Sequence, residues 1–195
     1  MSLEQKLYKK IYNMRELYIA LHKGLRTFRY MKKAKKMKHL SPHLIERIML
    51  AVTEVNGCEV CSYAHTKMAL EQGMSNEEIK MLLVGNTEKV SNDEMTAVMF
   101  AQYYADTRGN PSKESWDRVV QTYGKEKALG ILGAVRAIMI GNIYGLALSA
   151  FKSRLKGKKI EKTNLFYEIR MMYYSAFTSS FDPWSDFYLV KDAFD

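Results

Sequence analysis

Proline and cysteine are scarce in this sequence, which has three prolines and two cysteines in 195 residues. The low proline content and the 47% share of hydrophobic residues are typical of a globular protein, long enough for one domain with extensions. No segment alternates apolar and polar residues with a period of two, so we predict no sheet and an all-α fold. The first ten residues, MSLEQKLYKK, lack the apolar stretch of a secretory signal, which predicts a cytoplasmic protein in a reducing compartment.

Both cysteines stand in one C-x-x-C motif, Cys58 and Cys61, and His65 follows four residues later. Residues three and four apart share one face of a helix, so we expect these three side chains to point the same way. At this spacing the two Cα atoms lie within the roughly 4.4–6.8 Å that a disulfide needs. The free N–H groups and dipole of a helix N-terminus also favour a thiolate. The motif therefore predicts a reversible, redox-active disulfide.

The motif follows a helix-break-helix pattern. Ser41-Pro42 is typical of a helix start, with a serine cap and a proline at the first position. Asn56-Gly57 ends this helix because both residues tolerate the left-handed conformation. Cys58 then begins a second helix, which we expect to run to Gly73. Glu46 lies in the first, largely apolar helix, where a carboxylate partly removed from water is a candidate for proton transfer.

The pattern E-x11-C-x2-C-x3-H, preceded by V-N-G-C, resembles the alkylhydroperoxidase D-like branch of the carboxymuconolactone decarboxylase superfamily. The resemblance is strongest over residues 41–85 and continues more weakly to about residue 155. It implies a single helical domain that assembles into a homo-oligomer.

The resemblance also implies a catalytic set of Glu46, Cys58, Cys61 and His65. In that set Cys61 attacks a peroxide, possibly an organic one, and Cys58 resolves the product as a disulfide. An external dithiol protein re-reduces the pair, and no cofactor is needed. Some members have a histidine between the cysteines where this chain has Val60, which removes one proton carrier. The decarboxylases proper lack the cysteine pair, so its presence argues against lactone decarboxylation.

The residues by themselves leave the order of the two cysteines open. Cys58 is nearer the helix N-terminus, so the dipole alone makes it the more acidic thiol. Cys61 has His65 one turn away, and a hydrogen-bonding partner can outweigh a dipole effect of roughly 0.3–1 kcal/mol. We therefore predict, in line with the resemblance, that Cys61 is the attacking residue.

Other interpretations of the motif stay open at this point. Each cysteine could be a small buried hydrophobic residue with no redox role. Two thiolates, His65 and Glu46 could also supply four zinc ligands, but zinc sites usually use separated pairs and the chain has no second C-x-x-C or H-x3-H. We therefore predict no bound metal. A third alternative is an enzyme related to the carboxymuconolactone decarboxylases that acts on another substrate.

We predict three parts: a basic amphipathic helix or arm over residues 1–40, the helical domain over 41–155 and an aromatic-rich helical extension over 156–195. Within 3–30, apolar residues repeat in steps of four and three, which predicts a coiled-coil-like seam packed on the chain's own domain or on a second subunit. The seam residues are Leu7, Ile11, Met14, Tyr18, Leu21, Leu25 and Phe28.

The first forty residues are strongly basic. They carry twelve Lys or Arg against Glu4 and Glu16, a balance of +10, compared with +9 for the whole chain. Such a run can be a solvated helix face or a contact for nucleic acid or an anionic membrane. No nucleic-acid motif accompanies it, so we expect no specific nucleic-acid binding.

Three more helices are predicted between residues 75 and 123. Ser75 and Ser91 each precede a glutamate by three residues, the pattern of a capping box that begins a helix. We expect these helices to end near Gly85 and Thr107, and a third to run over 112–123.

Residues 128–151 form the most apolar stretch, and their length could span a bilayer. Arg136 and Asn142 lie near its middle, however, where a charge is costly in lipid. We predict no membrane span but a buried central helix, in which Gly141 and Gly145 let neighbouring helices approach closely.

Ten aromatic residues lie between residue 165 and the end of the chain. We expect them to cover the chain's own core or an adjoining subunit, since aromatic side chains are enriched in interfaces. Together with the seam they predict a homo-oligomer. They also leave open a non-enzymatic helical protein whose basic arm or aromatic tail binds a partner.

Overall fold

The computed structural model describes residues 10–158 and 162–179, and for residues 175–179 the backbone alone. This part of the chain contains helices and no strand, which confirms the prediction of an all-α fold. The helices are α2 (Met14–Lys36), α3 (Pro42–Asn56), α4 (Glu59–Glu71), α5 (Asn76–Leu82), α6 (Asn92–Asp106), α7 (Lys113–Leu155) and α8 (Leu165–Ser179).

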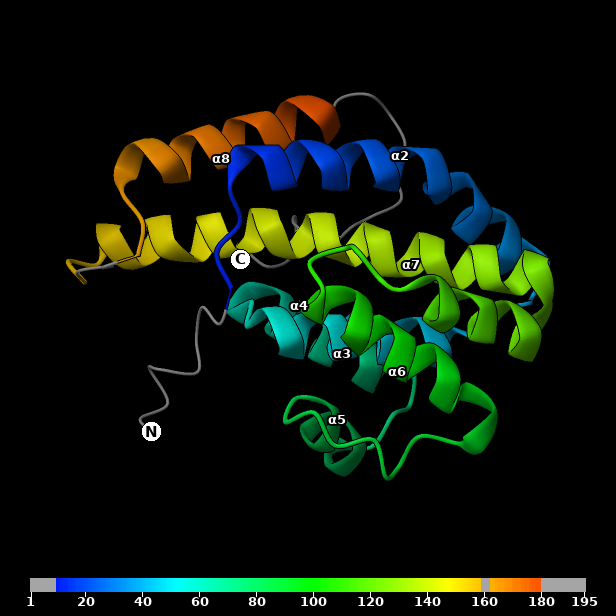
Figure 1. Ribbon diagram of the computed structural model, residues 1–195. Helices are drawn as coiled ribbons and strands as arrows, with labels where there is room; N and C mark the ends of the chain where they lie inside the picture. Colours follow the sequence, from blue (N-terminus) through cyan, green and yellow to red (C-terminus); the bar gives the residue numbers. More distant parts are fainter. Residues whose placement is uncertain (1–9, 159–161, 180–195) are drawn as a thin grey trace.

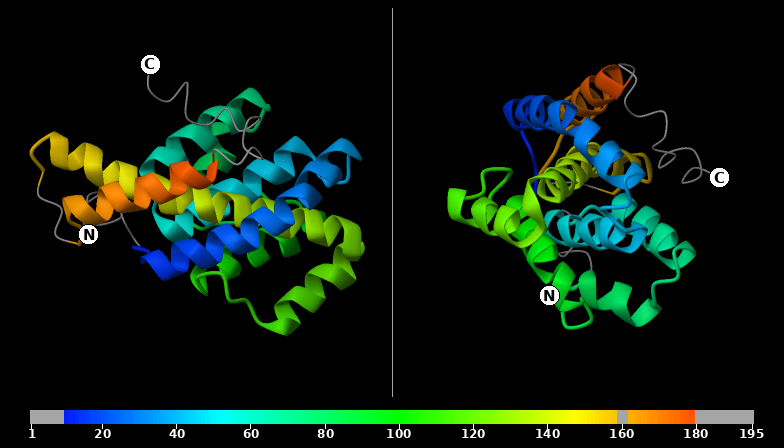
Figure 2. Two further views of the ribbon diagram at one scale, coloured as in Figure 1. Left: turned by 90° about the horizontal axis from the view of Figure 1, so that it is seen from above. Right: turned by 90° about the vertical axis from the view of Figure 1, so that its right-hand side faces the viewer.

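The long helix α7 runs through the middle of the molecule (Figure 1). Helices α2 and α8 pack on one side of it, and α3, α4 and α6 pack on the other. The short helix α5 touches α3 and α4, at the outer edge of the second group. The two further views in Figure 2 show the same layers from above and from the end. The core therefore surrounds α7, and the motif-bearing helices α3 and α4 both reach it.

Helix α7 consists of two parts that meet at a kink. Gly124 has φ 73° and ψ 159°, which is not helical, and it follows the predicted first segment directly. By length and composition alone, α7 is the one described helix that could cross a membrane. However, 83% of its apolar 18-residue segment is buried inside the protein. This agrees with the prediction of a buried central helix.

Helix α2 begins later than the sequence predicted. Residues 10–13 are not helical, and residues 1–9, with Leu7 of the predicted seam, lie outside the described residues. Asn13 is the cap: its side chain accepts a hydrogen bond from the Glu16 N–H (3.0 Å), and Glu16 accepts one from the Asn13 N–H (2.7 Å). This capping box was missed in the sequence, and it sets the helix start at Met14.

The predicted seam on α2 is only partly buried in the chain's own core, and its packing on a second subunit stays a prediction. Tyr18 is 70% exposed and Leu25 is 39% exposed, whereas Leu21 and Phe28 are buried as expected. The buried face of α2 consists of Leu17, Leu21, Gly24, Thr27, Phe28, Met31 and Ala34.

Small residues form part of the buried face of α2. A Cβ added at Gly24 would collide with Ile140 of α7. A Cβ at Gly133 of α7 would lie 2.8 Å from the Thr27 carbonyl oxygen, and one at Gly130 would lie 2.5 Å from the Ala34 Cβ. At these positions the two helices approach too closely for a larger side chain, and a pattern of large apolar residues does not reveal the glycines that allow it.

The two predicted capping boxes are only partly formed. Ser75 does cap α5, accepting a hydrogen bond from the Glu78 N–H (3.1 Å), but Ser91 begins α6 without a side-chain bond. Both glutamates bind Arg47 of α3 instead of the cap backbone, through contacts of 2.6 Å from Glu78 to Nε and from Glu94 to Nη1. A bond between a carboxylate and a half-buried, oppositely charged arginine is stronger than a bond from the same carboxylate to an uncharged backbone N–H, which explains the difference.

Helix α8 leaves several aromatic side chains on the surface. Phe166 is 73% exposed, Tyr173 64% and Tyr174 46%, so they do not cover the chain's own core. Tyr167 is half-buried, and its hydroxyl donates a hydrogen bond to the Tyr12 carbonyl oxygen (2.6 Å). The predicted aromatics from Phe177 onward lie outside the described side chains.

Candidate functional site

The cysteine motif occupies the junction between α3 and α4. Ser41 caps α3 by accepting a hydrogen bond from the Leu44 N–H (3.0 Å), with Pro42 at the first position, as predicted. Gly57 ends the helix in the left-handed conformation, φ 72° and ψ 39°, which the Asn-Gly pair indicated. Cys58 is the cap of α4. A tight break thus places the cysteines in the first turn of a new helix.

Cys58 and Cys61 form a disulfide, with their Cα atoms 5.3 Å apart. The Cys61 N–H donates a hydrogen bond to the Cys58 sulfur (3.3 Å), so the cap of α4 is itself a sulfur atom. The Cys61 sulfur lies 3.6 Å from the carbonyl oxygen of Gly141 on α7. The pair is therefore held between the first turn of α4 and the middle of α7.

The two sulfur-bearing residues differ in exposure. Cys58 is completely buried, whereas Cys61 is 9% exposed. The difference is small in area, but a reactive sulfur must be reached by its substrate. Cys61 is the residue of the pair that solvent reaches.

Gly145 packs directly against the disulfide. A Cβ added to this residue would lie 2.5 Å from the Cys58 sulfur and 2.6 Å from the Cys61 sulfur. The sequence analysis predicted that Gly141 and Gly145 permit close helix approach, but it did not identify the cysteine pair as the neighbour. The i, i+4 spacing of these glycines is the signal that could have found it, because it places both on the same face of α7.

Glu46 and His65 form a buried pair beside the motif. His65 Nδ1 lies 2.9 Å from Glu46 Oε2, and the residues are 1% and 4% exposed. Glu46 comes from the second turn of α3, and His65 stands one turn after Cys61 on α4. The described hydrogen bond of His65 therefore goes to Glu46 and not to a sulfur, so the expected contact between His65 and Cys61 stays a prediction.

The geometry fixes what the imidazole can do. A carboxylate on Glu46 accepts the Nδ1–H hydrogen bond, which leaves the lone pair of a neutral ring on Nε2. Nε2 has no hydrogen-bond partner among the described residues. The pair can therefore take up a proton at Nε2, and the carboxylate stabilises the resulting charge.

Buried polar residues form hydrogen bonds at the junction between α3 and α4. Asn56, the last residue of α3, accepts a hydrogen bond from the Tyr12 hydroxyl (2.6 Å) and donates one to the Met139 sulfur (3.4 Å). Thr53 donates to the Asn142 Oδ1 (3.1 Å) on α7. Burial raises the pKa of Tyr12 well above its usual range, so the phenol stays a neutral donor. The sequence analysis did not predict these hydrogen bonds, because Tyr12 and α7 come close to Asn56 only in the folded chain.

The described residues contain no group of three or more His, Cys, Asp or Glu side chains that could hold a metal ion. The four predicted site residues do come from one region, but two of them are tied in the disulfide and two in the Glu46–His65 pair. The arrangement is thus two adjacent pairs rather than a single ligand shell.

Comparisons with known proteins find a similarity over part of the chain. No curated protein matches the chain, and no solved structure matches it either. The family model that does match covers the C-terminal half of α2, all of α3, α4 and α5, and most of α6, including all four predicted site residues. Residues 23–101, less than half of the chain, match the carboxymuconolactone decarboxylase family.

Proposed function

We propose that this protein is a thiol-dependent oxidoreductase that reduces peroxides through a Cys58–Cys61 dithiol/disulfide cycle. The observation that carries the proposal is the disulfide itself, at a helix start and beside the buried Glu46–His65 pair. The match to the carboxymuconolactone decarboxylase family is compatible with such an activity. Within that family we assign the chain to the alkylhydroperoxidase D-like branch, because of its cysteine pair.

The first step begins from the reduced pair. The Cys61 thiolate attacks one peroxide oxygen, an S–O bond forms and the O–O bond breaks. The second oxygen leaves as an alcohol or water after it takes up a proton, and Cys61 becomes a sulfenic acid. The exposure of Cys61 and the complete burial of Cys58 support this order.

In the second step the Cys58 sulfur attacks the sulfenic sulfur. The S–S bond forms, the S–O bond breaks, and the hydroxyl leaves as water with one proton. The sum of both steps is one peroxide and two thiols converted to one alcohol, one water and one disulfide. An external dithiol supplies two electrons and two protons to restore the thiols by thiol-disulfide exchange.

Glu46 and His65 handle the protons in this scheme. His65 Nε2 accepts the thiol proton and returns it to the leaving oxygen, while Glu46 holds Nδ1 and stabilises the imidazolium. Both residues are nearly completely buried, and the low dielectric strengthens their interaction. The thiolate form of Cys58 is favoured by the hydrogen bond from the Cys61 N–H and by its position at the first turn of α4.

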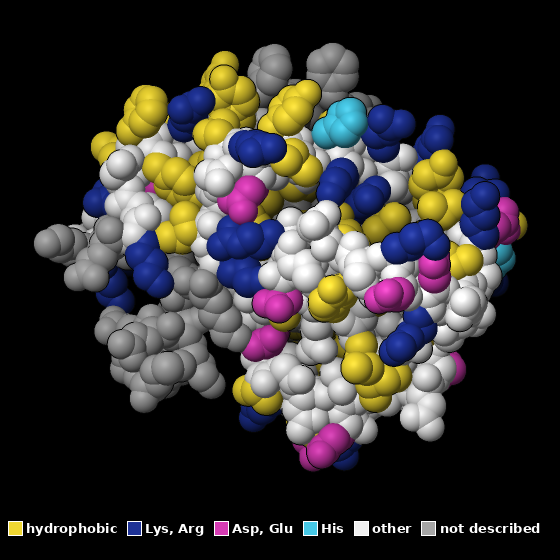
Figure 3. Space-filling model, viewed as in Figure 1, with side chains coloured by type: hydrophobic (Ala, Val, Ile, Leu, Met, Phe, Trp, Pro, Cys, Tyr) yellow, Lys and Arg dark blue, Asp and Glu magenta, His cyan; other side chains and the backbone are white. Residues whose placement is uncertain are grey.

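A second proposal concerns assembly. The exposed apolar side chains of α2 and α8 support a homo-oligomer, since soluble monomers rarely expose several large hydrophobic residues close together. These residues are Tyr18, Ile19, Leu25, Leu165, Phe166, Ile169, Tyr173 and Tyr174. Figure 3 shows hydrophobic side chains gathered along the edge that α8 and the first half of α2 form.

A carboxymuconolactone decarboxylase-related enzyme on another substrate is the competing function, and it needs no thiol cycle.

Thiol counting tests the proposed chemistry. The reduced protein should have two free thiols and lose both to one equivalent of peroxide. In Cys58→Ser, Cys61 should stop at a trappable sulfenic acid because nothing resolves it, whereas Cys61→Ser should give none. Two thiols that remain free would reject the proposal, and a sulfenic acid found at Cys58 in Cys61→Ser would reverse the roles.

A further inference from the structure

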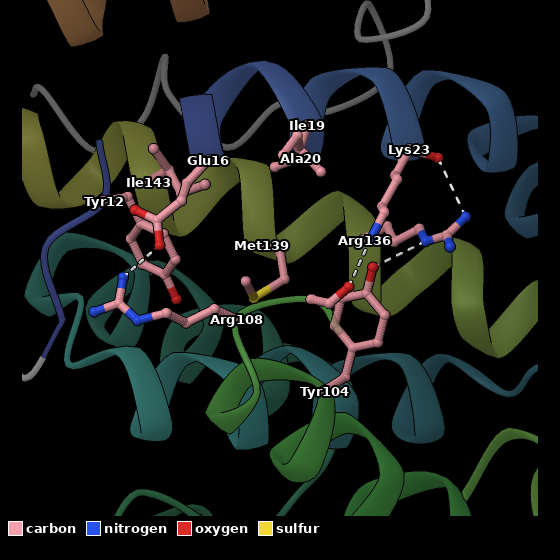
Figure 4. A pocket seen from close by; sticks show the side chains of 11 residues that line it. Tyr12, Glu16, Ile19, Ala20, Lys23, Tyr104, Arg108, Arg136, Met139 and Ile143 are labelled. Carbon is pink, nitrogen blue, oxygen red and sulfur yellow. Dashed lines mark hydrogen bonds and ion pairs between the residues drawn. The ribbon is translucent and has the colours of Figure 1, made fainter. Parts of the chain in front are cut away.

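A small cleft lies on the opposite side of α7 from the disulfide (Figure 4). Its volume is about 50 Å³, which is room for about four water molecules at roughly 10–15 Å³ each. The lining residues come from the segment before α2, from α2 itself, from the end of α6 and from α7. They are Tyr12, Glu16, Ile19, Ala20, Lys23, Tyr104, Arg108, Gly109, Arg136, Met139 and Ile143.

One end of the cleft has more hydrogen-bond donors than acceptors. Lys23 Nζ donates one bond, to the Gly109 carbonyl oxygen (2.8 Å), and has two protons left. Arg136 donates from Nε to the Tyr104 hydroxyl (3.0 Å) and from Nη1 to the Lys23 carbonyl oxygen (3.4 Å), and Nη2 has no acceptor among the described residues. The Tyr104 hydroxyl accepts that bond, and its own proton has no acceptor among the described residues. Figure 4 shows the side chains of Lys23 and Tyr104 ending beside the Arg136 side chain.

The same end of the cleft has few negatively charged groups. Glu16 is the one carboxylate in the lining, and it is already bound by Arg108 (2.7 Å) and by the Asn13 N–H. Neither Lys23 nor Arg136 forms an ion pair with a described residue. Burial, together with the nearby Arg136 charge, lowers the pKa of Lys23. Two cations thus line the same end of a partly desolvated site with no counter-charge among the described residues, which is unfavourable unless an anion joins them.

We propose that this cleft binds a small oxyanion group, a carboxylate or a phosphate, through Lys23, Arg136 and Tyr104. An oxyanion can accept hydrogen bonds from the unused donors of all three residues. Its negative charge also offsets the positive charges of Lys23 and Arg136. The apolar side chains of Ile19, Met139 and Ile143 line the rest of the cleft and offer a place for a short hydrocarbon chain attached to the oxyanion.

The oxyanion site is separate from the thiol site. Met139 and Ile143 of α7 line the cleft, whereas Gly141 and Gly145 contact the disulfide. An offset of two residues turns about 200° around a helix axis. The site does not depend on the peroxidase proposal, so either one can fail without the other.

Calorimetric titration of the oxidised protein with inorganic phosphate and, separately, with butyrate tests the proposal. Lys23→Gln should weaken binding about tenfold or more, because a charged hydrogen bond is lost. Arg26→Gln is the matched control: it removes one positive charge from the exposed face of the same helix and should leave the affinity nearly unchanged. Tyr104→Phe removes a neutral donor and also the acceptor of the Arg136 Nε bond, which frees a second Arg136 donor, so it should weaken binding less than Lys23→Gln does.

The two ligands distinguish the source of the oxyanion. Tighter binding of butyrate assigns the cleft to an organic carboxylate, and phosphate binding without butyrate binding assigns it to a phosphate group. No saturable binding of either ligand would overturn the proposal. Equal affinities in Lys23→Gln and Arg26→Gln would also overturn it, because the attraction would then come from overall charge.

Discussion

Gly145→Ala tests whether the disulfide is packed against α7 as closely as described. The new Cβ would lie 2.5 Å and 2.6 Å from the Cys58 and Cys61 sulfurs, well inside the roughly 3.5–4.0 Å of an ordinary contact. Both sulfurs are fixed by their mutual bond at the start of α4, so α4 must shift as a unit. Overpacking of this kind costs about 1–3 kcal/mol.

Gly141→Ala is the matched control, one turn earlier on the same helix. The nearest atom to its new Cβ is Ile138 Cδ1 at 3.8 Å, an ordinary contact. Alanine in a helix interior is favoured over glycine by about 1 kcal/mol, so this variant should gain that amount. In Gly145→Ala the same gain offsets part of the overpacking cost, which leaves a loss of about 0–2 kcal/mol.

The free energy of unfolding of the two oxidised variants, measured by urea titration at one pH, gives the comparison. Gly145→Ala should be less stable than Gly141→Ala by about 1–3 kcal/mol. Equal stability of the two variants, or a more stable Gly145→Ala, would refute the close packing of the disulfide on α7.

Three other predictions concern the catalytic pair, assembly and the basic arm. His65→Gln and Glu46→Gln should each slow peroxide-driven disulfide formation roughly 100-fold, as loss of general acid-base help does, without preventing it at long times; unchanged rates in stopped-flow measurements would exclude a proton-transfer role. Light scattering should give a mass above the 22.6 kDa of one chain, and a monomer at micromolar concentration would contradict assembly. Any nucleic-acid association should be weak and should fade steeply with salt, so tight, sequence-selective binding at physiological salt would favour the non-enzymatic alternative.

Local signals explain why the cysteine junction could be predicted from the sequence. The Ser41-Pro42 start, the Asn56-Gly57 break and the spacing of Cys58 and Cys61 act within a few residues. Such features are decided by backbone conformation and helix geometry, which a sequence pattern records directly.

Contacts between distant segments could not be predicted in the same way. Gly24 and Gly133 let α2 and α7 approach closely, beside Ile140 and Met31, and a pattern of large apolar residues does not reveal these glycines. The hydrogen bond between Tyr12 and Asn56 joins residues 44 apart. The Glu46–His65 bond crosses from α3 to α4, and helical spacing within α4 does not reveal it.

The most direct test of the thiol cycle is peroxide consumption by the purified protein in the presence of a dithiol reductant. The thiol cycle predicts turnover, with one dithiol oxidised for each peroxide consumed, and no turnover in Cys61→Ser or Cys58→Ser. A wild-type protein that consumes no peroxide beyond the reductant-only control, or a Cys61→Ser variant that turns over like the wild type, would contradict it.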